Sequence, residues 1–150
     1  MGLFAQILPD HHRHCDELFV VAEEAAQSGD WVAATAAFEH FNAQMQAHFD
    51  AEEVVLFPAF EAATGMSQGP TQMMRQEHQQ MRSLLAQMEF ACSGQDEDGY
   101  AGAAETLLML MQQHNMKEEN ILYPMCDQAP IPEAEGLGAK IAATLENGRG

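Results

Sequence analysis

Apolar residues recur every three to four positions along most of this chain, a spacing that predicts amphipathic α-helices. No stretch shows the strict alternation of a β-strand. The expected helices run from Asp10 to about Gln27, from Trp31 to about Thr64, from Thr71 to about Cys92 and from Tyr100 to about Asp127. Because the breaks between them are short, successive helices should be antiparallel neighbours. The pattern therefore predicts an all-α protein with an up-down-up-down four-helix bundle.

Prolines set the expected boundaries and irregularities of these helices. Pro9 should precede the first helix, since proline is tolerated in a first turn and not inside a helix. Pro58 and Pro124 fall inside the second and fourth helices, where the missing N–H predicts a kink. We expect the bundle to span residues 1–130, and residues 131–150 to be a tail that is either a short helix or frayed.

Two apolar faces are interrupted by polar residues in the same pattern. HFDAEEVVLFP begins at His48 and HNMKEENILYP begins at His114, and both read H-x3-E-E-x2-L-[F/Y]-P. Residues four apart lie on one face of a helix, so each histidine stands beside a carboxylate, Glu52 or Glu118. Burying these groups without partners would cost several kcal/mol each. The repeated pairs therefore predict a site that binds metal between them.

The other two helices also carry histidines on their apolar faces. His78 lies in the stripe of the third helix. The first helix offers His11, His12 and His14, and simple helical geometry puts His11 closest to the centre of its apolar face. Each helix of the predicted bundle can thus direct at least one imidazole towards a common interior point.

Four imidazoles and two carboxylates suit a pair of first-row transition ions. Imidazole nitrogen favours iron, copper, nickel or zinc, and carboxylate oxygen favours iron or manganese. If both carboxylates bridge the two ions, coordination positions stay open for a small diatomic ligand or a bridging oxygen. The Glu-x-x-His pairs of ferritin-like proteins and the HExxH motif of zinc proteases are absent.

With these motifs the chain resembles a bacterial hemerythrin-like domain of the HHE cation-binding family. The matching stretches are HRHCDELF in the first helix, HFDAEEVVLFP, EHQQMR in the third helix and HNMKEENILYP, over roughly residues 10–127. The resemblance implies a four-helix bundle with two iron ions joined by a bridging oxo or hydroxo group. It also implies oxygen binding, sensing of oxygen or nitric oxide, iron handling, or a response to oxidative or nitrosative stress.

Matched by position, the resemblance implies one set of metal ligands. His12 fits the family spacing on the first helix, with His11 as the next choice. The implied ligands are His12, His48, Glu52, His78, His114 and Glu118. Oxygen-carrying hemerythrins have a further histidine one turn after the third-helix ligand, and Arg82 stands there in this chain. The resemblance therefore favours a six-ligand variant over simple oxygen carriage.

Several neighbours of the ligands have weaker expected roles. Glu53, Glu77 and Glu119 should point to solvent or support the ligands from outside. Tyr123 stands where the first repeat has Phe57, so the pattern does not require its hydroxyl, which argues against a catalytic phenol.

Composition limits the partners and the compartment. Six basic against 23 acidic residues give a net charge of −17, which disfavours nucleic acid and membrane surfaces as partners. No segment reaches the length of a membrane span. Three widely spaced cysteines without a CxxC motif indicate reduced thiols, and we expect a cytoplasmic protein.

Three functions are consistent with the predicted site. The first is a di-iron module that binds or senses oxygen, nitric oxide or peroxide. The second is a di-iron enzyme that reduces peroxide or nitric oxide or donates iron. The third is a zinc protein in which the metal only stabilises the bundle.

Overall fold

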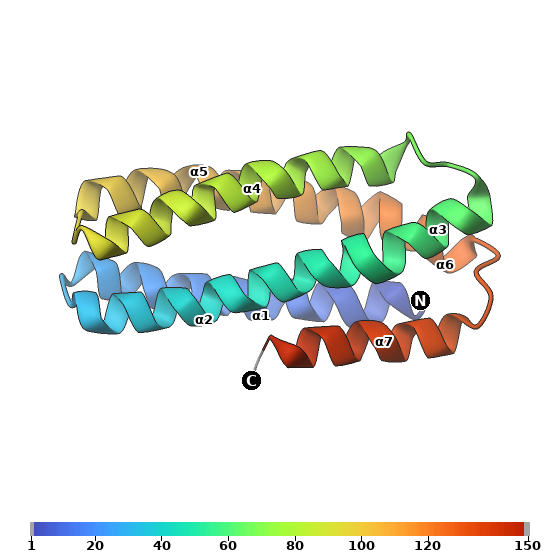
Figure 1. The fold of residues 1–150 in the computed structure, drawn as a ribbon, viewed down its shortest axis with the longest axis horizontal. Helices are drawn as coiled ribbons and strands as arrows, with labels where there is room; N and C mark the ends of the chain where they lie inside the picture. The colour runs from blue at the N-terminus through green and yellow to red at the C-terminus, as the bar shows by residue number, and fades with distance from the viewer. Residues whose placement is uncertain (1, 149–150) are drawn as a thin grey trace.

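Helices account for almost all of the computed structural model, which describes residues 2–148 (Figure 1). In chain order they are α1 (Phe4–Gln27), α2 (Trp31–Asp50), η1 (Ala51–Leu56), α3 (Phe57–Thr64), α4 (Pro70–Ser93), α5 (Glu97–Lys117), η2 (Glu118–Leu122), α6 (Tyr123–Gln128) and α7 (Ala134–Asn147). The segments η1 and η2 are π-helical. The described residues contain no strand, and the all-α prediction is confirmed.

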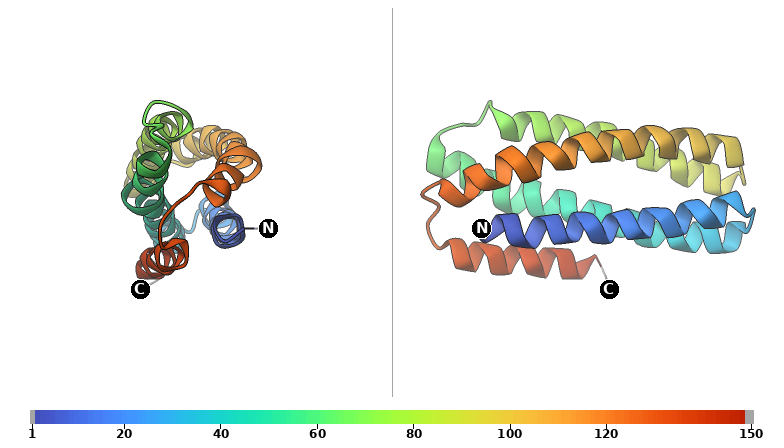
Figure 2. Two further views of the ribbon diagram at one scale, coloured as in Figure 1. Left: turned by 90° about the vertical axis from the view of Figure 1, so that its right-hand side faces the viewer. Right: turned by 180° about the vertical axis from the view of Figure 1, so that it is seen from behind.

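The long helices pack as an antiparallel bundle. α1 packs against α2, α2 against α4, α4 against α5, and α5 against α1, which closes a ring of four (Figures 1 and 2). Capping residues begin two of them, since Asp30 accepts a hydrogen bond from the N–H of Ala33 and Asp96 accepts one from the N–H of Gly99. The predicted up-down-up-down topology is confirmed.

The first helix begins earlier than the sequence predicts. α1 begins at Phe4 and contains Pro9. The N–H groups of Phe4 and Ala5 donate to the carboxylate of Asp127 at 2.9 and 3.2 Å, so a distant side chain caps this helix. Phe4 and Leu8 are buried. Burial of these side chains and the cap from Asp127 offset the loss of the backbone hydrogen bond that Pro9 cannot make. The predicted start of the helix after Pro9 is therefore wrong.

The two predicted kinks correspond to π-helical segments. α2 continues through η1 into α3, and α5 continues through η2 into α6, without a gap in helical residues. The N–H of Phe57 donates to the carbonyl of Glu52 and that of Tyr123 to the carbonyl of Glu118, five residues back in each case. Each segment ends two residues before a proline. The proline, which has no N–H, therefore lies after the wider π-helical turn and not within it.

The hydrophobic core consists of two clusters. Core cluster A includes Cys15, Phe19, Phe38, Phe41, Met45, Met81, Leu85, Met88, Leu107 and Met111. Core cluster B includes Phe4, Leu8, Leu56, Phe57, Phe60, Met74, Leu122, Tyr123, Ile141 and Leu145. Along α2 and η1, and again along α5 and η2, the repeated motif puts histidine and glutamate between a residue of cluster A and a residue of cluster B. The polar site thus lies between two apolar regions that hold the helices in place.

The C-terminal helix α7 lies outside the ring of four. It packs against α1, α2 and η1, as the end-on view shows (Figure 2). Ile141 is fully buried and Leu145 nearly so, both in core cluster B. Of the two predicted forms of the tail, the described part takes the helical one, and residues 149–150 lie outside the described residues. The division of the chain at residue 130 stays a prediction.

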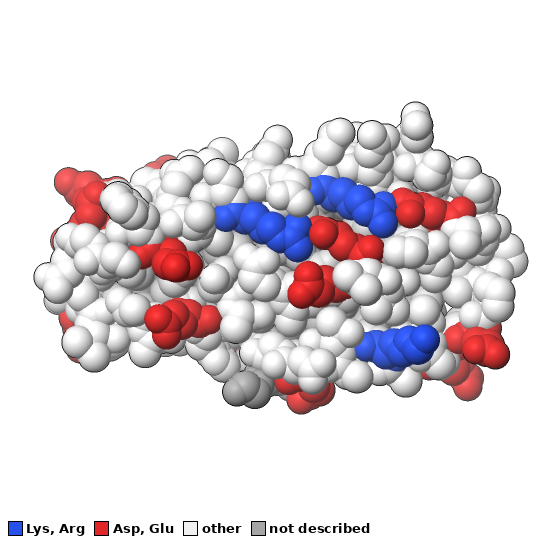
Figure 3. All heavy atoms as spheres, viewed as in Figure 1, with Lys and Arg blue, Asp and Glu red and all other residues white. Residues whose placement is uncertain are grey.

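The surface carries the acidic charge of the chain. On the face in Figure 3, each basic group has acidic groups beside it. Two of the ion pairs are Arg75 with Glu61 and Arg82 with Glu53. None of the described helices is long and apolar enough to cross a membrane.

Candidate metal centre

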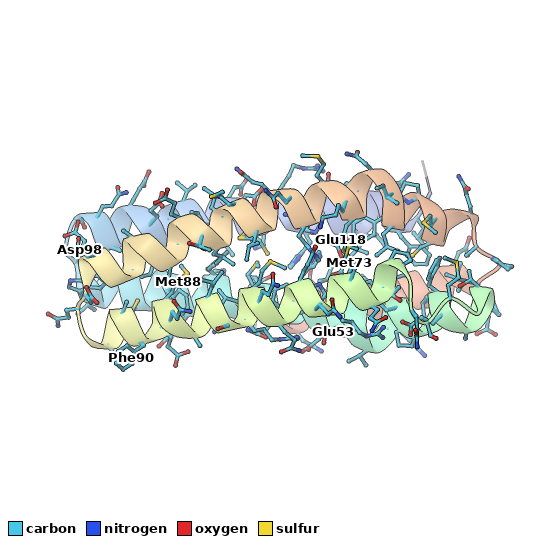
Figure 4. All side chains as sticks on the ribbon, turned by 90° about the horizontal axis from the view of Figure 1, so that it is seen from above. Glu53, Met73, Met88, Phe90, Asp98 and Glu118 are labelled. Carbon is cyan, nitrogen blue, oxygen red and sulfur yellow. The ribbon has the colours of Figure 1, made fainter. Side chains whose placement is uncertain are left out.

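The bundle brings the six predicted ligands together in its interior. They come from six helical segments: His12 from α1, His48 from α2, Glu52 from η1, His78 from α4, His114 from α5 and Glu118 from η2. All six are buried, and both glutamates are fully so. Figure 4 shows Glu118 between α4 and α5, pointing into the bundle.

The six side chains form two donor groups that share both carboxylates. The first donor group is His12, His48, Glu52 and Glu118, and the second donor group is Glu52, His78, His114 and Glu118. Within each group one ligand atom from every residue lies within 4.8 Å of the others. Two adjacent sites with two imidazoles each and two shared carboxylates can hold a pair of metal ions.

Buried atoms without hydrogen bonds show that the donor set suits a cation. Nε2 of His78 lies 2.9 Å from Oε1 of Glu52, and neither atom has a hydrogen-bond partner. Nε2 of His114, 3.2 Å from Oε1 of Glu118, also has none. Buried polar atoms in proteins are normally satisfied. Here imidazole nitrogens and carboxylate oxygens lie close together without forming hydrogen bonds to each other. Ligands of a single metal ion have the same arrangement.

The electrostatics of the site point the same way. Burial alone would lower the pKa of His48, but the carboxylates of Glu52 and Glu118 raise it to about 9. Burial is likewise outweighed at His114, where Glu118 raises the pKa to about 10. Burial would raise the pKa of Glu118, but His114 and other neighbours hold it well below its usual value. The two buried carboxylates therefore stabilise positive charge beside them, and protons or metal ions can supply that charge.

Three of the four imidazoles are supported by an outer carboxylate. Nδ1 of His12 lies 2.7 Å from Glu119, Nδ1 of His78 lies 2.5 Å from Glu53, and Nδ1 of His114 lies 2.7 Å from Glu77. A carboxylate on Nδ1 fixes the proton there and directs the Nε2 lone pair to the metal. These three glutamates thus take the supporting role, which was one of the two expected for them.

The fourth imidazole has a neutral support. Nδ1 of His48 lies 2.9 Å from Nδ1 of His11, and Nε2 of His11 lies 2.8 Å from Oε1 of Gln44. Burial and the neighbouring His48 lower the pKa of His11 to about 3, so it is a neutral ring whose Nδ1 can accept a hydrogen bond from Nδ1–H of His48. His11, the predicted alternative ligand, therefore lies behind a ligand. His14, the other alternative, is in neither donor group.

Sequence reasoning did not select Gln44. It is fully buried and stands one turn before His48 on the same helix. A polar residue four positions before a candidate ligand, on the inward face, was the available signal.

Arg82 stays outside the two donor groups. Its guanidinium lies 2.8 Å from Glu53 and 3.1 Å from Gln46, and it covers the ring of Phe49 at 5.0 Å. Arg82 therefore stabilises the carboxylate that supports His78 and adds no ligand.

Tyr123 enters the site, although the sequence interpretation gave its hydroxyl no role. The residue is fully buried. Its oxygen lies 2.5 Å from Oε2 of Glu52 and 2.9 Å from Oε1 of Glu118. Burial, followed by these two carboxylates, raises the pKa of Tyr123 well above its usual value.

A small cavity borders the donors on the side of core cluster A. It offers about 10 Å³ to the centre of a water-sized molecule, which is roughly the room for one water. Its lining residues are His12, Cys15, Met45, His48, Phe49, Met81, Met111, His114 and Asn115. Three candidate ligands thus face a largely apolar space that suits a molecule of very few atoms.

Comparison with known proteins gives one match. The family model of the hemerythrin HHE cation binding domain matches residues 3–126. No curated protein and no solved structure matches the chain significantly. The matched range contains all six members of the two donor groups.

Proposed function

The chain belongs to the hemerythrin HHE cation-binding family, and from that premise we propose that it is a non-heme di-iron protein that binds or senses oxygen, nitric oxide or peroxide. The observation that carries this proposal is the pair of donor groups sharing Glu52 and Glu118, with unsatisfied lone pairs inside the bundle. We assign His12, His48, His78 and His114 as terminal ligands and the two glutamates as bridges.

The donor chemistry favours iron. Two imidazoles and two carboxylates per ion combine the nitrogen and oxygen ligands that iron accepts. Four donors saturate a tetrahedral zinc ion but leave positions free on an ion of higher coordination number. When bound, two irons with an oxo or hydroxo bridge would supply open coordination positions and a reversible change of oxidation state.

The surroundings favour a very small ligand. The cavity beside His12, His48 and His114 has room for roughly one water-sized molecule and is walled mainly by apolar side chains. Such a wall excludes larger or charged molecules, because they would lose hydration without compensation. Oxygen, nitric oxide and peroxide are small enough for this space.

The experiment is metal analysis of anaerobically purified protein with absorption spectra before and after exposure to oxygen. We expect two irons per chain and a charge-transfer band that appears with oxygen and fades when oxygen is removed. Nitric oxide and peroxide should be tested in parallel. Two tightly bound irons that respond to none of the three ligands would refute the proposal, and so would stoichiometric zinc in a colourless protein.

The same preparation distinguishes binding from catalysis. The alternative function is a di-iron enzyme of oxidative or nitrosative stress, which reduces peroxide or nitric oxide or donates iron. Steady consumption of peroxide or nitric oxide with a reductant would favour the enzyme, and a single stoichiometric response would favour the binding or sensing protein. We place either activity in a reducing cytoplasm, with no nucleic acid or membrane partner.

A further inference from the structure

The hydroxyl of Tyr123 occupies the first donor group and has no counterpart in the second. Besides its contacts with both carboxylates, its oxygen lies 3.3 Å from Nε2 of His12 and 3.3 Å from Nε2 of His48. Phe57 holds the corresponding place in the other repeat, with its ring 5.9 Å from that of His78. The two halves of the site, otherwise related by the repeated motif, therefore differ at this atom.

Hydrogen bonding alone does not account for the position of this oxygen. A phenol has one proton to donate. Two carboxylate oxygens and two imidazole nitrogens surround the hydroxyl of Tyr123 within 3.3 Å. One proton can satisfy one or two of them. At least two of the four atoms therefore receive no proton from this hydroxyl, although all four lie around it.

The spacing is that of ligands around a single ion. Nitrogen and oxygen ligands bind first-row ions at about 2.0–2.2 Å, so adjacent ligands of one ion lie about 3 Å apart. The phenol oxygen lies between 2.5 and 3.3 Å from all four other donors of the first group. It is thus placed as a fifth donor.

We propose that Tyr123 is a metal ligand. Its phenolate oxygen would be the fifth protein donor to the ion held by His12, His48 and the two shared carboxylates. This inference rests on the proposed metal binding. When a trivalent ion binds, the O–H bond breaks, an oxygen–metal bond forms and the proton leaves to solvent, with no change in oxidation state. The ion beside Tyr123 then has five protein donors and the other ion has four.

This asymmetry decides where a small ligand binds. A phenolate fills one position on the ion of the first donor group, which leaves more open positions on the ion held by His78 and His114. The small cavity is lined by His114 of the second donor group and by His12 and His48 of the first, so it is open to both ions. The exogenous ligand should therefore bind the ion of the second donor group.

Absorption and resonance Raman spectra of the oxidised, iron-loaded protein test the proposal. We expect a phenolate-to-ferric charge-transfer band in the visible, with tyrosine ring vibrations enhanced under it. Tyr123→Phe should lose both signals while still binding two metals. The matched control is Tyr100→Phe, which removes the other of the two tyrosines in the chain, a buried residue of core cluster A. In that control the signals should persist.

The control also protects the test against a folding defect in the Tyr123 variant. In Tyr100→Phe, Tyr123 is the sole tyrosine, so any tyrosine signal belongs to it without any change in the site. Wild-type or Tyr100→Phe protein that binds ferric iron without enhanced tyrosine vibrations would overturn the proposal. A Tyr123→Phe protein that keeps the band would overturn it as well.

A redox-inert ion separates this inference from the proposed function. Gallium(III), a colourless mimic of ferric iron, should produce the ultraviolet difference spectrum of tyrosine ionisation in wild-type protein and none in Tyr123→Phe. That result would support metal ligation by Tyr123 even in a protein that does not respond to oxygen. Conversely, an oxygen-responsive di-iron protein without a tyrosine signal would refute metal ligation by Tyr123 and leave the proposed function intact.

Discussion

Glu77 lies outside the two donor groups, and we expect it to control metal affinity. Its carboxylate accepts from Nδ1 of His114 at 2.7 Å and also pairs with Lys117. Burial opposes ionisation of this carboxyl, but the hydrogen bond from His114 prevails and lowers its pKa, so it is a carboxylate at neutral pH. A negative charge on Nδ1 makes Nε2 a stronger donor to a metal.

Glu77→Gln keeps an oxygen that can accept from His114 but removes the charge. We expect metal affinity to fall about 10–100-fold, measured by competition with a chromogenic chelator. Glu105→Gln is the matched control, since it removes one charge from the same chain at an exposed position. An equal loss in both variants would show that net charge, and not the contact with His114, controls affinity.

At the scale of residues, spacing predicted what repeats and missed what does not. The HxxxE pairs could be identified because a helix puts residues four apart on one face. The chain from His48 through His11 to Gln44 has no motif, since two of its contacts cross from α1 to α2. The hydroxyl of Tyr123 was dismissed because its partner in the repeat is Phe57. This difference between the repeats nevertheless places a hydroxyl in the first donor group and none in the second.

Among the helices, α7 makes the least predictable contribution to the fold. The sequence left open whether this tail is helical or frayed, yet Ile141 is fully buried in core cluster B. Phe4 and Leu8 of the same cluster belong to the segment that the proline rule had excluded from α1. The first and last helices thus stabilise each other by contacts that are distant in sequence, and local patterns do not reveal such contacts.

Ile141→Ala tests this contribution. Removing a buried isoleucine side chain to alanine should lower the free energy of unfolding by about 2–5 kcal/mol, measured by urea denaturation of the metal-free protein. Lys140→Ala, at the exposed neighbouring position, should change it little. If both variants unfold alike, α7 does not contribute to the stability of the core.

The π-helical segments illustrate a partial success at the same scale. Pro58 and Pro124 correctly marked where each long helix becomes irregular. Proline chemistry alone does not distinguish a kink from a widened turn, because both relieve the missing N–H. The outcome here places Glu52 and Glu118 inside the irregular segments, each with its own carbonyl accepting the five-residue hydrogen bond. The two shared carboxylates are therefore held by backbone that departs from the regular helix.

For the whole molecule, the buried imidazoles link stability to pH. A histidine whose pKa rises on folding stabilises the folded state below its unfolded value of about 6.5, and loses that contribution as the pH rises through its folded value. The folded pKa is about 9 for His48 and about 10 for His114. The metal-free protein should therefore lose stability between about pH 6.5 and 10.

Metal loading should remove this alkaline loss. Metal ions occupy the same nitrogen lone pairs that protons occupy in the metal-free protein, so the loaded imidazoles have no proton to lose. The loaded protein should instead lose stability as the pH falls below neutral, because protons then compete with the metal. Urea unfolding followed by circular dichroism, at several pH values with and without metal, measures both trends.

A pair of histidine variants assigns the alkaline loss to the site. His48→Gln removes one of the histidines with a raised pKa, so the metal-free variant should lose less stability than wild type as the pH rises. His40→Gln, at an exposed position outside both donor groups, should leave the slope unchanged. Metal-free wild-type protein that is as stable at about pH 9.5 as at about pH 6.5 would contradict the prediction. The interior carboxylates would then hold too little positive charge in the absence of metal to contribute to folding.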